Sequence, residues 1–450
     1  GMGGSSLAPE VMCATDKVAL TVLDTTDPGQ VADALAGDLE RTVLVVSSKS
    51  GSTVETDCHR RVFAAAFAAA GLDPAAHLVV VTDPGSPLQQ IADADGYRAV
   101  ITADPDVGGR YSALTAFGLV PAGLAGVDIA NLLDDAAQVA PILAVDDPAN
   151  PALRLATALA GGHAAGADKV VLADTGSGIV GFGDWAEQLI AESTGKDGTG
   201  LLPVVVEGPS APGFADAGPD AIPVVTGPGV EAAAVSVTGT LGEQFLLWEH
   251  ATAVVGRLLA INPFDQPDVE AAKIAARAAL HGAIGPTVES AFVDGDVAVH
   301  PVGGWLPAGA ATLRDAVAAL VAATPQGGFL AVQAYLDRIA DASAAVLRTE
   351  LARRTRVQTT FGWGPRFLHS TGQYHKGGHP NGAFLQLTGE VVADIPVPGA
   401  AFTLGGLQRA QAVGDAEVLA GHGRPVLRLH LADRVAGLIQ VVRAVHELRL

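Results

Sequence analysis

Hydroxyl groups, one ammonium group and the start of a helical pattern coincide in residues 47–55 (SSKSGSTVE). The segment follows the apolar run 42–47 and opens the Ala-rich run 54–70, so it joins a predicted strand to a predicted helix. Ser52 and Glu55 have the spacing of a capping box. Free N–H groups at a helix start, hydroxyls and an ammonium are the donors that a phosphate dianion needs. The pattern predicts a phosphate site without Walker spacing; a Ser-rich turn before a capped helix is the alternative.

A carboxylate stands at the end of a second helical pattern. Glu192 closes the predicted helix 185–192, which stops before Gly195. A carboxylate in the last turn of a helix faces the negative end of the dipole, which suits a base that takes up a carbon-bound proton. The alternative is a surface glutamate beside Lys196.

Residues 262–270 (NPFDQPDVE) combine two prolines and a carboxamide with a helix start. Pro267 stands where the predicted helix 269–280 begins. Gln266 and Lys273 are two helical turns apart, so both side chains can point at one ligand. A plain junction between a loop and a helix is the alternative.

The segment 108–112 (GGRYS) places two glycines before Arg110. Glycine lets a backbone approach closely, and a guanidinium can stabilise an oxyanion. The segment therefore adds a candidate for electrostatic stabilisation of a transition state.

A competing motif occurs in the middle of the chain. Residues 176–181 (GSGIVG) match the GxGxxG pattern of a dinucleotide site and follow a predicted strand. Glu207 closes a later strand and is the acid that would bind the ribose. Its offset is longer than usual, and Asp184 and Trp185 crowd the turn. An NAD-linked oxidoreductase is therefore an alternative function.

These candidates need a scaffold of strands and helices. The runs 42–47 and 77–82 are predicted to be buried strands flanking the helix 54–70, and further strands are predicted at 169–173 and 202–206. Strands that alternate with helices predict parallel sheets covered on both faces.

A third unit begins near residue 296. It contains the predicted strand 329–332, a long helix to Arg354 and a loop-rich stretch at 361–380. The segment 146–151 (DDPANP) resembles a helix stop or linker. We therefore predict three domains, with the boundaries 1–148, 149–295 and 296–450.

Composition limits the classes of function. The 450 residues carry a net charge of −21, which argues against binding to nucleic acid or an anionic membrane. No signal peptide and no run long enough to span a bilayer is visible, and two cysteines exclude a disulfide framework. We expect a cytoplasmic protein without a metal site.

Five segments, in order along the chain, resemble the phosphoglucose isomerase family: 1–11 (GMGGSSLAPEV), 47–56 (SSKSGSTVET), 107–121 (VGGRYSALTAFGLVP), 183–196 (GDWAEQLIAESTGK) and 262–273 (NPFDQPDVEAAK). Two later segments, 361–378 and 402–415, are similar to the isomerase half of bacterial transaldolase/phosphoglucose isomerase fusion proteins. The Gly-rich start looks like a turn that follows a strand, which indicates that the chain is a piece of a longer polypeptide; a Gly1 left from a tag, which happens to complete the pattern, is the alternative.

The resemblance implies a fold and partners. The fold would be two sugar-isomerase (SIS) three-layer αβα domains with parallel sheets, plus a C-terminal α/β unit. The partner would be a small sugar phosphate, with no cofactor. A homodimer and a covalent fusion to a transaldolase domain are further expectations.

The resemblance also implies roles for single residues. The 6-phosphate would be held by Ser48, Lys49, Ser50 and Thr53, with Ser5 nearby. Glu192 would move the proton between C2 and C1. Arg110 and the backbone of Gly109 would stabilise the enediolate. Gln266 and Lys273 would complete the site, with Lys273 assisting ring opening.

The chain departs from the family in one respect. The family has a ring-opening histidine after the glutamate motif, but no histidine lies between Lys196 and Gln244. His250 is the nearest candidate and His375 the next. Action of Lys273 alone, or binding of the open-chain sugar, are the alternatives.

The expected reaction is the reversible conversion of glucose 6-phosphate to fructose 6-phosphate through an enediolate. A dual phosphoglucose/phosphomannose isomerase is one alternative. A non-catalytic regulator that binds a sugar phosphate is another.

Overall fold

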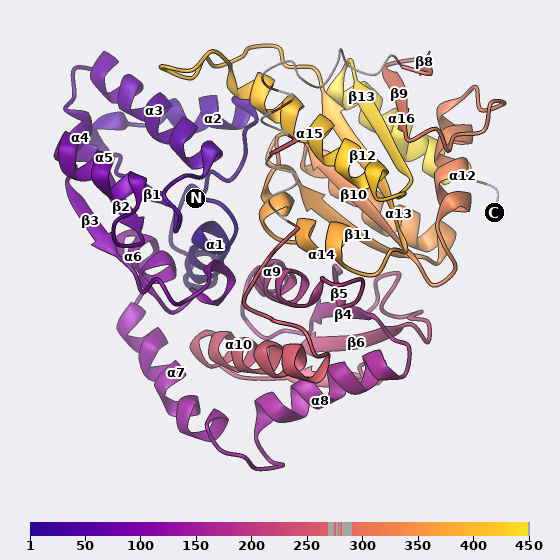
Figure 1. Ribbon diagram of the computed structural model, residues 1–450, viewed down its shortest axis with the longest axis horizontal. Helices are drawn as coiled ribbons and strands as arrows, with labels where there is room; N and C mark the ends of the chain where they lie inside the picture. The colour runs from indigo at the N-terminus through magenta and orange to yellow at the C-terminus, as the bar shows by residue number, and fades with distance from the viewer. Residues whose placement is uncertain (269–273, 276–277, 279, 281–289, 449–450) are drawn as a thin grey trace.

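Three β-sheets surrounded by helices make up the computed structural model, which describes residues 1–268, 274–275, 278, 280 and 290–448 (Figure 1). The prediction of an α/β protein with parallel sheets is confirmed. Within the described part of the chain, no helix has the length and apolar character needed to cross a membrane.

The first sheet contains three parallel strands in the order β1-β2-β3, namely β1 (Leu44–Ser47), β2 (Leu78–Thr82) and β3 (Ala99–Thr102). Among the described strands β1 pairs with β2 alone, so its other edge is unpaired. The helices of this part of the chain are α1 (Gly4–Asp16), α2 (Pro28–Leu35), η1 (Leu39–Arg41), α3 (Val54–Ala69), α4 (Pro74–His77), α5 (Pro87–Asp95), η2 (Gly109–Tyr111), α6 (Ala116–Ala125) and α7 (Ile129–Leu143), of which α7 packs against α10 (Leu241–Leu258) of the second unit.

The second sheet is also parallel and has the order β5-β4-β6-β7. Asn150 caps α8 and accepts hydrogen bonds from Ala152 N and Leu153 N, so the predicted stop at 146–151 separates two helices. The elements are α8 (Pro151–Ala164), β4 (Lys169–Asp174), α9 (Phe182–Thr194), β5 (Leu202–Val205), β6 (Ala221–Thr226), β7 (Val235–Val237) and α10 (Leu241–Leu258).

The third sheet has six strands in the order β11-β10-β12-β13-β9-β8, with β9 and β8 antiparallel at one edge. Its strands are β8 (Phe292–Asp294), β9 (Val297–Val302), β10 (Phe329–Tyr335), β11 (Gln358–Trp363), β12 (Gly382–Gly389) and β13 (Val426–Leu431). Its helices are α12 (Leu313–Ala323), η3 (Ala342–Ala345), α13 (Val346–Thr355), η4 (Arg366–His369), α14 (Gly372–Gly377), α15 (Leu404–Gly421) and α16 (Arg434–His446).

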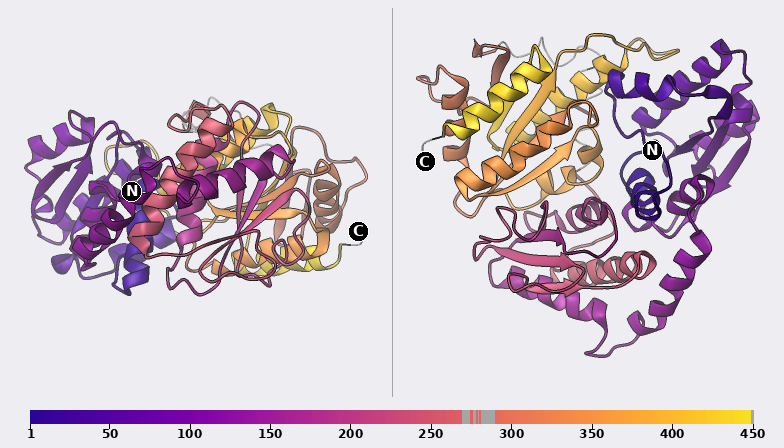
Figure 2. Two further views of the ribbon diagram at one scale, coloured as in Figure 1. Left: turned by 90° about the horizontal axis from the view of Figure 1, so that it is seen from below. Right: turned by 180° about the vertical axis from the view of Figure 1, so that it is seen from behind.

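Buried aromatic side chains fix α9 against α10. The Trp185 ring lies 4.6 Å from Phe245, and Phe182 lies 6.0 Å from Trp248. α9 also contacts α1 of the first unit and α14 of the third unit, and these two units lie above the second unit in Figure 1 and in the right-hand view of Figure 2. The carboxyl end of α9 thus meets elements from all three units.

Two predictions of local structure are wrong. Thr53, not Ser52, precedes α3, and no side chain caps this helix start. Glu55 instead accepts hydrogen bonds from His369 and Gln411, so the spacing of a capping box is fortuitous here. The long helix ending at Arg354 is also shorter than predicted, because η3 precedes α13.

Candidate active site

The Gly-rich turn before α1 passes between several elements at the centre of the molecule. A Cβ atom on Gly4 would lie 1.9 Å from Gly109 O, and one on Gly3 would lie 2.7 Å from both Gln188 Nε2 and His369 O. Gly3 also has a φ of +54°. A side chain at either position would clash with these atoms, so only glycine is accommodated. The glycines thus allow η2, α9 and η4 to pack closely around this turn.

Glu192 lies in the last turn of α9 with its side chain 12% exposed. Its Oε1 is 3.2 Å from Nη1 of Arg110, and its Oε2 accepts a hydrogen bond of 3.1 Å from Gln188 Nε2. The same amide group donates to His369 O at 2.8 Å. The carboxylate is therefore oriented from both sides while it keeps access to solvent, as a base acting on a bound ligand requires.

Arg110 is buried and joins η2 to the corner at residues 262–266. Its Nε donates to Ser193 Oγ at 2.9 Å, and its Nη2 donates to Pro263 O and Asp265 O at 2.7 Å each. Its Nη1 donates to Gln266 Oε1 at 2.9 Å. The structure thus brings together Arg110, Glu192 and Gln266, three of the residues that the sequence singled out.

The buried ammonium group of Lys196 also contacts the corner at residues 262–266. Lys196 Nζ donates to Asn262 O at 2.6 Å and to Asp265 Oδ1 at 2.7 Å. Burial lowers the pKa of Lys196, and the hydrogen bond that the ammonium donates to Asp265 opposes that change. This lysine was noted in the sequence only as a neighbour of Glu192, and its structural role is to position the loop that contacts Arg110.

The segment 48–53 lies between β1 and α3, at the carboxyl end of the strand. Ser48 Oγ and Thr53 Oγ1 are 3.0 Å apart, and Ser50 Oγ accepts a hydrogen bond of 3.1 Å from Ser52 Oγ. Since the Thr53 hydroxyl does not cap α3, the helix start presents N–H groups together with these hydroxyls. That combination is suited to a phosphate group.

Lys49 belongs to this segment, but its ammonium is engaged elsewhere. Lys49 Nζ lies 2.7 Å from Asp83 Oδ2 and donates to Pro105 O at 2.9 Å. Both partners lie in loops of the first unit, so the ammonium must exchange partners or act through its charge if it contacts a ligand. Ser5 is half-buried in the first turn of α1, close to Gly1 and the end of β1.

A buried pair of titratable groups lies beside the same segment. Glu55 Oε1 accepts a hydrogen bond of 3.0 Å from His369 Nε2 and one of 2.6 Å from Gln411 Nε2. Burial raises the pKa of Glu55, but the charge and hydrogen bond of His369 outweigh it and lower the pKa to about 2. The carboxylate thereby fixes the His369 imidazole beside the helix that follows the segment 48–53.

The histidines predicted from the sequence are not at this place. His250 is exposed on α10, and no hydrogen bond or ion pair joins it to Glu192 or Arg110 in the described part of the chain. His375 is buried against Phe329 and Phe384, where burial holds its pKa well below the usual range. Lys273 lies outside the described residues.

The glycine-rich motif at 176–181 does not form a dinucleotide site. Asp174 accepts hydrogen bonds from Gly176 N at 2.9 Å and Ser177 N at 3.1 Å, so these N–H groups are occupied. Glu207 forms an ion pair of 2.5 Å with Arg348. The groups expected to bind the pyrophosphate and the ribose are thus satisfied within the protein.

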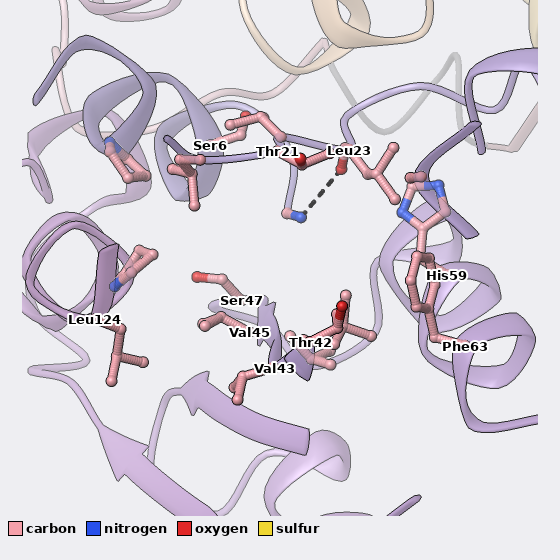
Figure 3. Close-up of a pocket in the computed structure, with 18 of the residues that line it drawn as sticks. Ser6, Thr21, Leu23, Thr42, Val43, Val45, Ser47, His59, Phe63 and Leu124 are labelled. Atoms are coloured by element: carbon pink, nitrogen blue, oxygen red, sulfur yellow. Dashed lines mark hydrogen bonds between the residues drawn. The ribbon is translucent and has the colours of Figure 1, made fainter. Parts of the chain in front are cut away.

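A cavity of about 560 Å³ adjoins the site at the unpaired edge of β1 (Figure 3). Apolar side chains such as Val43, Val45 and Phe63 line it together with polar ones such as Ser6, Ser47 and His59. The side chains that surround Glu192 do not line it, but Ser5 does. The cavity therefore touches one of the proposed phosphate-binding residues without reaching Glu192.

Sequence reasoning missed Gln188, His369 and the role of Glu55. Glu55 and His369 are 314 residues apart, and local spacing had explained Glu55 as a cap. One signal was available: the loop-rich stretch 361–380 contains three histidines, more than a loop needs for its turns.

The two parallel sheets of the first 240 residues, with helices packed around them, place the chain in the class of α/β proteins. No protein-family model matches it. It is 30% identical over 352 residues to a probable glucose-6-phosphate isomerase of Haloarcula marismortui, an alignment covering 65% of this chain and 79% of the relative. The chain belongs to the glucose-6-phosphate isomerase family.

Other similarities cover smaller shares. The glucose-6-phosphate isomerase of Thermosynechococcus vestitus is 32% identical over 347 residues, which are 62% of this chain but 65% of that protein. The crystal structure of a glucose-6-phosphate isomerase from Chlamydia trachomatis superposes with a TM-score of 0.54 at 22% identity, over 63% of this chain and 69% of that one, and so supports the fold alone. This chain thus spans just under two thirds of the length of the Thermosynechococcus protein.

Proposed function

We propose that this chain interconverts glucose 6-phosphate and fructose 6-phosphate by proton transfer. The 6-phosphate would bind the hydroxyls of Ser48, Ser50 and Thr53 at the start of α3, with Lys49 and Ser5 nearby. Binding energy from the phosphate would position C1 and C2 beside Glu192. Glu192 would then carry the proton between the two carbons.

The charge that develops on the sugar oxygen would be offset by Arg110. This guanidinium is fixed by five partners before any ligand binds, so little reorganisation would accompany the reaction. The Gly109 backbone and Gln266 flank it. Lys273 remains a proposed member of the site on the resemblance alone.

His369 is our candidate for the acid that opens the sugar ring. It replaces His250 in the proposal because its imidazole is hydrogen-bonded to Glu55 and its carbonyl accepts from Gln188, which also contacts Glu192. The contact with Glu55 fixes Nε2 and so orients the ring, and the other ring nitrogen, Nδ1, would pass the proton to the ring oxygen of the sugar.

One observation carries the proposal: an accessible carboxylate, Glu192, is held 3.2 Å from a fully engaged arginine at the carboxyl end of a helix. The test is turnover of fructose 6-phosphate to glucose 6-phosphate, followed through a coupled dehydrogenase in the presence of EDTA. We expect turnover that survives the chelator. Binding of fructose 6-phosphate without turnover would favour the non-catalytic regulator instead.

Mannose 6-phosphate is a second candidate substrate, since it differs from glucose 6-phosphate only in the configuration at C2, the carbon that Glu192 would deprotonate. A base that reaches both faces of the enediolate would produce both sugars. Product analysis by NMR, starting from fructose 6-phosphate, distinguishes the single isomerase from the dual one.

The similarity of residues 361–378 and 402–415 to fusion proteins also leads us to propose an upstream transaldolase domain in the native polypeptide. The unpaired edge of β1 and the adjoining cavity offer room for one additional parallel strand. The coding sequence upstream of Gly1 tests this proposal: an open frame for a transaldolase domain is expected, and a stop codon would contradict it.

We also propose that the protein is a homodimer, which sedimentation equilibrium tests. We propose a cytoplasmic location, which cell fractionation tests. The proposed domain boundaries are 1–148, 149–295 and 296–450, and limited proteolysis tests them.

A further inference from the structure

A second cavity lies in the third unit, away from the candidate active site. Its volume is about 370 Å³, within the range of sites for small molecules. It opens at the carboxyl ends of the parallel strands β10, β12 and β13, next to α15. Ligands of parallel α/β sheets bind at this end of the strands. The polar side chains that line it include those of Glu390, Gln408, Arg409, Arg428 and His430.

The face of the sheet toward this cavity is basic where a core is normally apolar. On β13, Leu427, Leu429 and Leu431 point into the hydrophobic core on the other face, so the alternating residues Arg428 and His430 face α15. The antiparallel register sets Arg428 opposite His300 on β9. The sequence thus places one guanidinium and two imidazoles on this wall, and Arg428 is only 5% exposed.

Arg428 is not neutralised by the protein. In the described part of the chain it makes no hydrogen bond or ion pair, although its guanidinium lines the cavity. Burial lowers the pKa of Arg428, and the charge of Glu417 only opposes that change. An unpaired guanidinium at such a depth is costly, and a bound anion would remove the cost.

Two neighbours on α15 supply further donors. The Nε2 group of Gln408 is buried without a hydrogen-bond partner, and Arg409 is exposed at the cavity without an ion pair among the described residues. The opposing charge is Glu390, which lies 3.4 Å from His430 and is 58% exposed at the mouth. Two guanidinium groups and a carboxamide thus line one cavity, and these are donors of the kind that bind a phosphate group.

We propose that this cavity is a second binding site, which takes a small phosphorylated metabolite and is distinct from the isomerase site. Arg428 would bind the phosphate from below, and Gln408 and Arg409 would close on it from α15. The site does not depend on the proposed isomerase function, because no residue of the candidate active site lines it.

Equilibrium dialysis with radiolabelled inorganic phosphate tests the site. The measurements use the full chain carrying Ser48→Ala and Thr53→Val, which weaken the first phosphate site. We expect one phosphate bound per chain, at least tenfold weaker binding in Arg409→Gln, and loss of binding in Arg428→Gln. Arg443→Gln, an exposed arginine on α16, is the matched control and should leave the affinity unchanged.

Because Arg428 is buried, its variant is checked for folding by circular dichroism, and the exposed Arg409 keeps the test valid if that variant is unstable. No bound phosphate in the double variant would overturn the proposal. Equal affinity in Arg409→Gln and Arg443→Gln would overturn it as well, whatever the outcome of the isomerase assay.

Discussion

His369 Nε2 lies 3.0 Å from Glu55 Oε1, although 314 residues separate the two in the chain. The pair joins the helix that follows the segment 48–53 to the loop that contacts Gln188 and thereby Glu192. If it opens the sugar ring, His369→Asn should lower turnover of the cyclic sugar about 10²- to 10⁴-fold. The measurement is kcat for glucose 6-phosphate.

The control for this prediction uses the exposed histidine on α10. His250→Asn should retain kcat within about twofold, since it makes no bond to the site in the described part of the chain. The reverse ranking, with His250 essential and His369 dispensable, would contradict the assignment.

The same pair predicts a dependence of stability on pH. Burial raises the pKa of Glu55, but His369 outweighs it and the pKa is about 2, below the ordinary 4.5. A carboxylate whose pKa is lowered by folding stabilises the protein above about pH 4.5, and this contribution disappears as the pH falls through about 2. It corresponds to roughly 3 kcal/mol.

Glu55→Gln removes that group, so the free energy of unfolding of the variant should fall less steeply than that of the parent between about pH 4.5 and 2. Urea unfolding at a series of pH values measures the two slopes. Parallel slopes would show that Glu55 is not held charged in the folded protein.

Glu192→Gln should lower kcat by about 10³-fold or more while KM changes little, because the amide keeps the shape of the side chain but cannot accept the proton. Glu231→Gln, an exposed glutamate in a loop, is the matched control. Near-normal turnover of the Glu192 variant would exclude it as the base.

Much of the fold and part of the site were predictable because the signals are local. The strand–turn–helix pattern around residues 42–70 and the helix ending near Glu192 follow from spacing alone. The partner of Glu55 was not predictable. The residues around Glu55 fit a capping box, and nothing in them indicates a hydrogen bond to an imidazole 314 residues away. Nor could spacing distinguish His369 from His375, which differ in burial and not in sequence context.

Gly4→Ala tests the packing that assembles the site. The added Cβ would lie 1.9 Å from Gly109 O, so backbone must move, and we expect a loss on the order of 3 kcal/mol of stability. Gly161→Ala, in α8 with no atom within 4 Å of the new Cβ, should raise stability by about 0.5–1 kcal/mol. Thermal unfolding compares them, and equal effects would contradict the close approach.

Arg366→Met tests the contact between the first and third units. Arg366 Nε donates to Asp24 Oδ2 at 2.5 Å, and the guanidinium also binds Glu10. Burial raises the pKa of Asp24, but Arg366 and Arg338 outweigh it and lower the pKa. Loss of Arg366 leaves the buried carboxylate with Arg338 at 3.8 Å as its ion-pair partner and the Ser6 hydroxyl as its hydrogen-bond donor, so we expect about 3 kcal/mol lower stability by urea unfolding. An unchanged midpoint would contradict this.

Solvent exchange tests the central claim most directly. Fructose 6-phosphate is converted in D₂O and the glucose 6-phosphate formed is examined by NMR for deuterium at C2. A proton held on Glu192 can exchange with solvent before it is returned to C2, so the parent protein should give product that is partly labelled at C2, and Glu192→Gln should give almost none in the same time. Equal turnover and equal labelling by the variant would contradict proton transfer through Glu192.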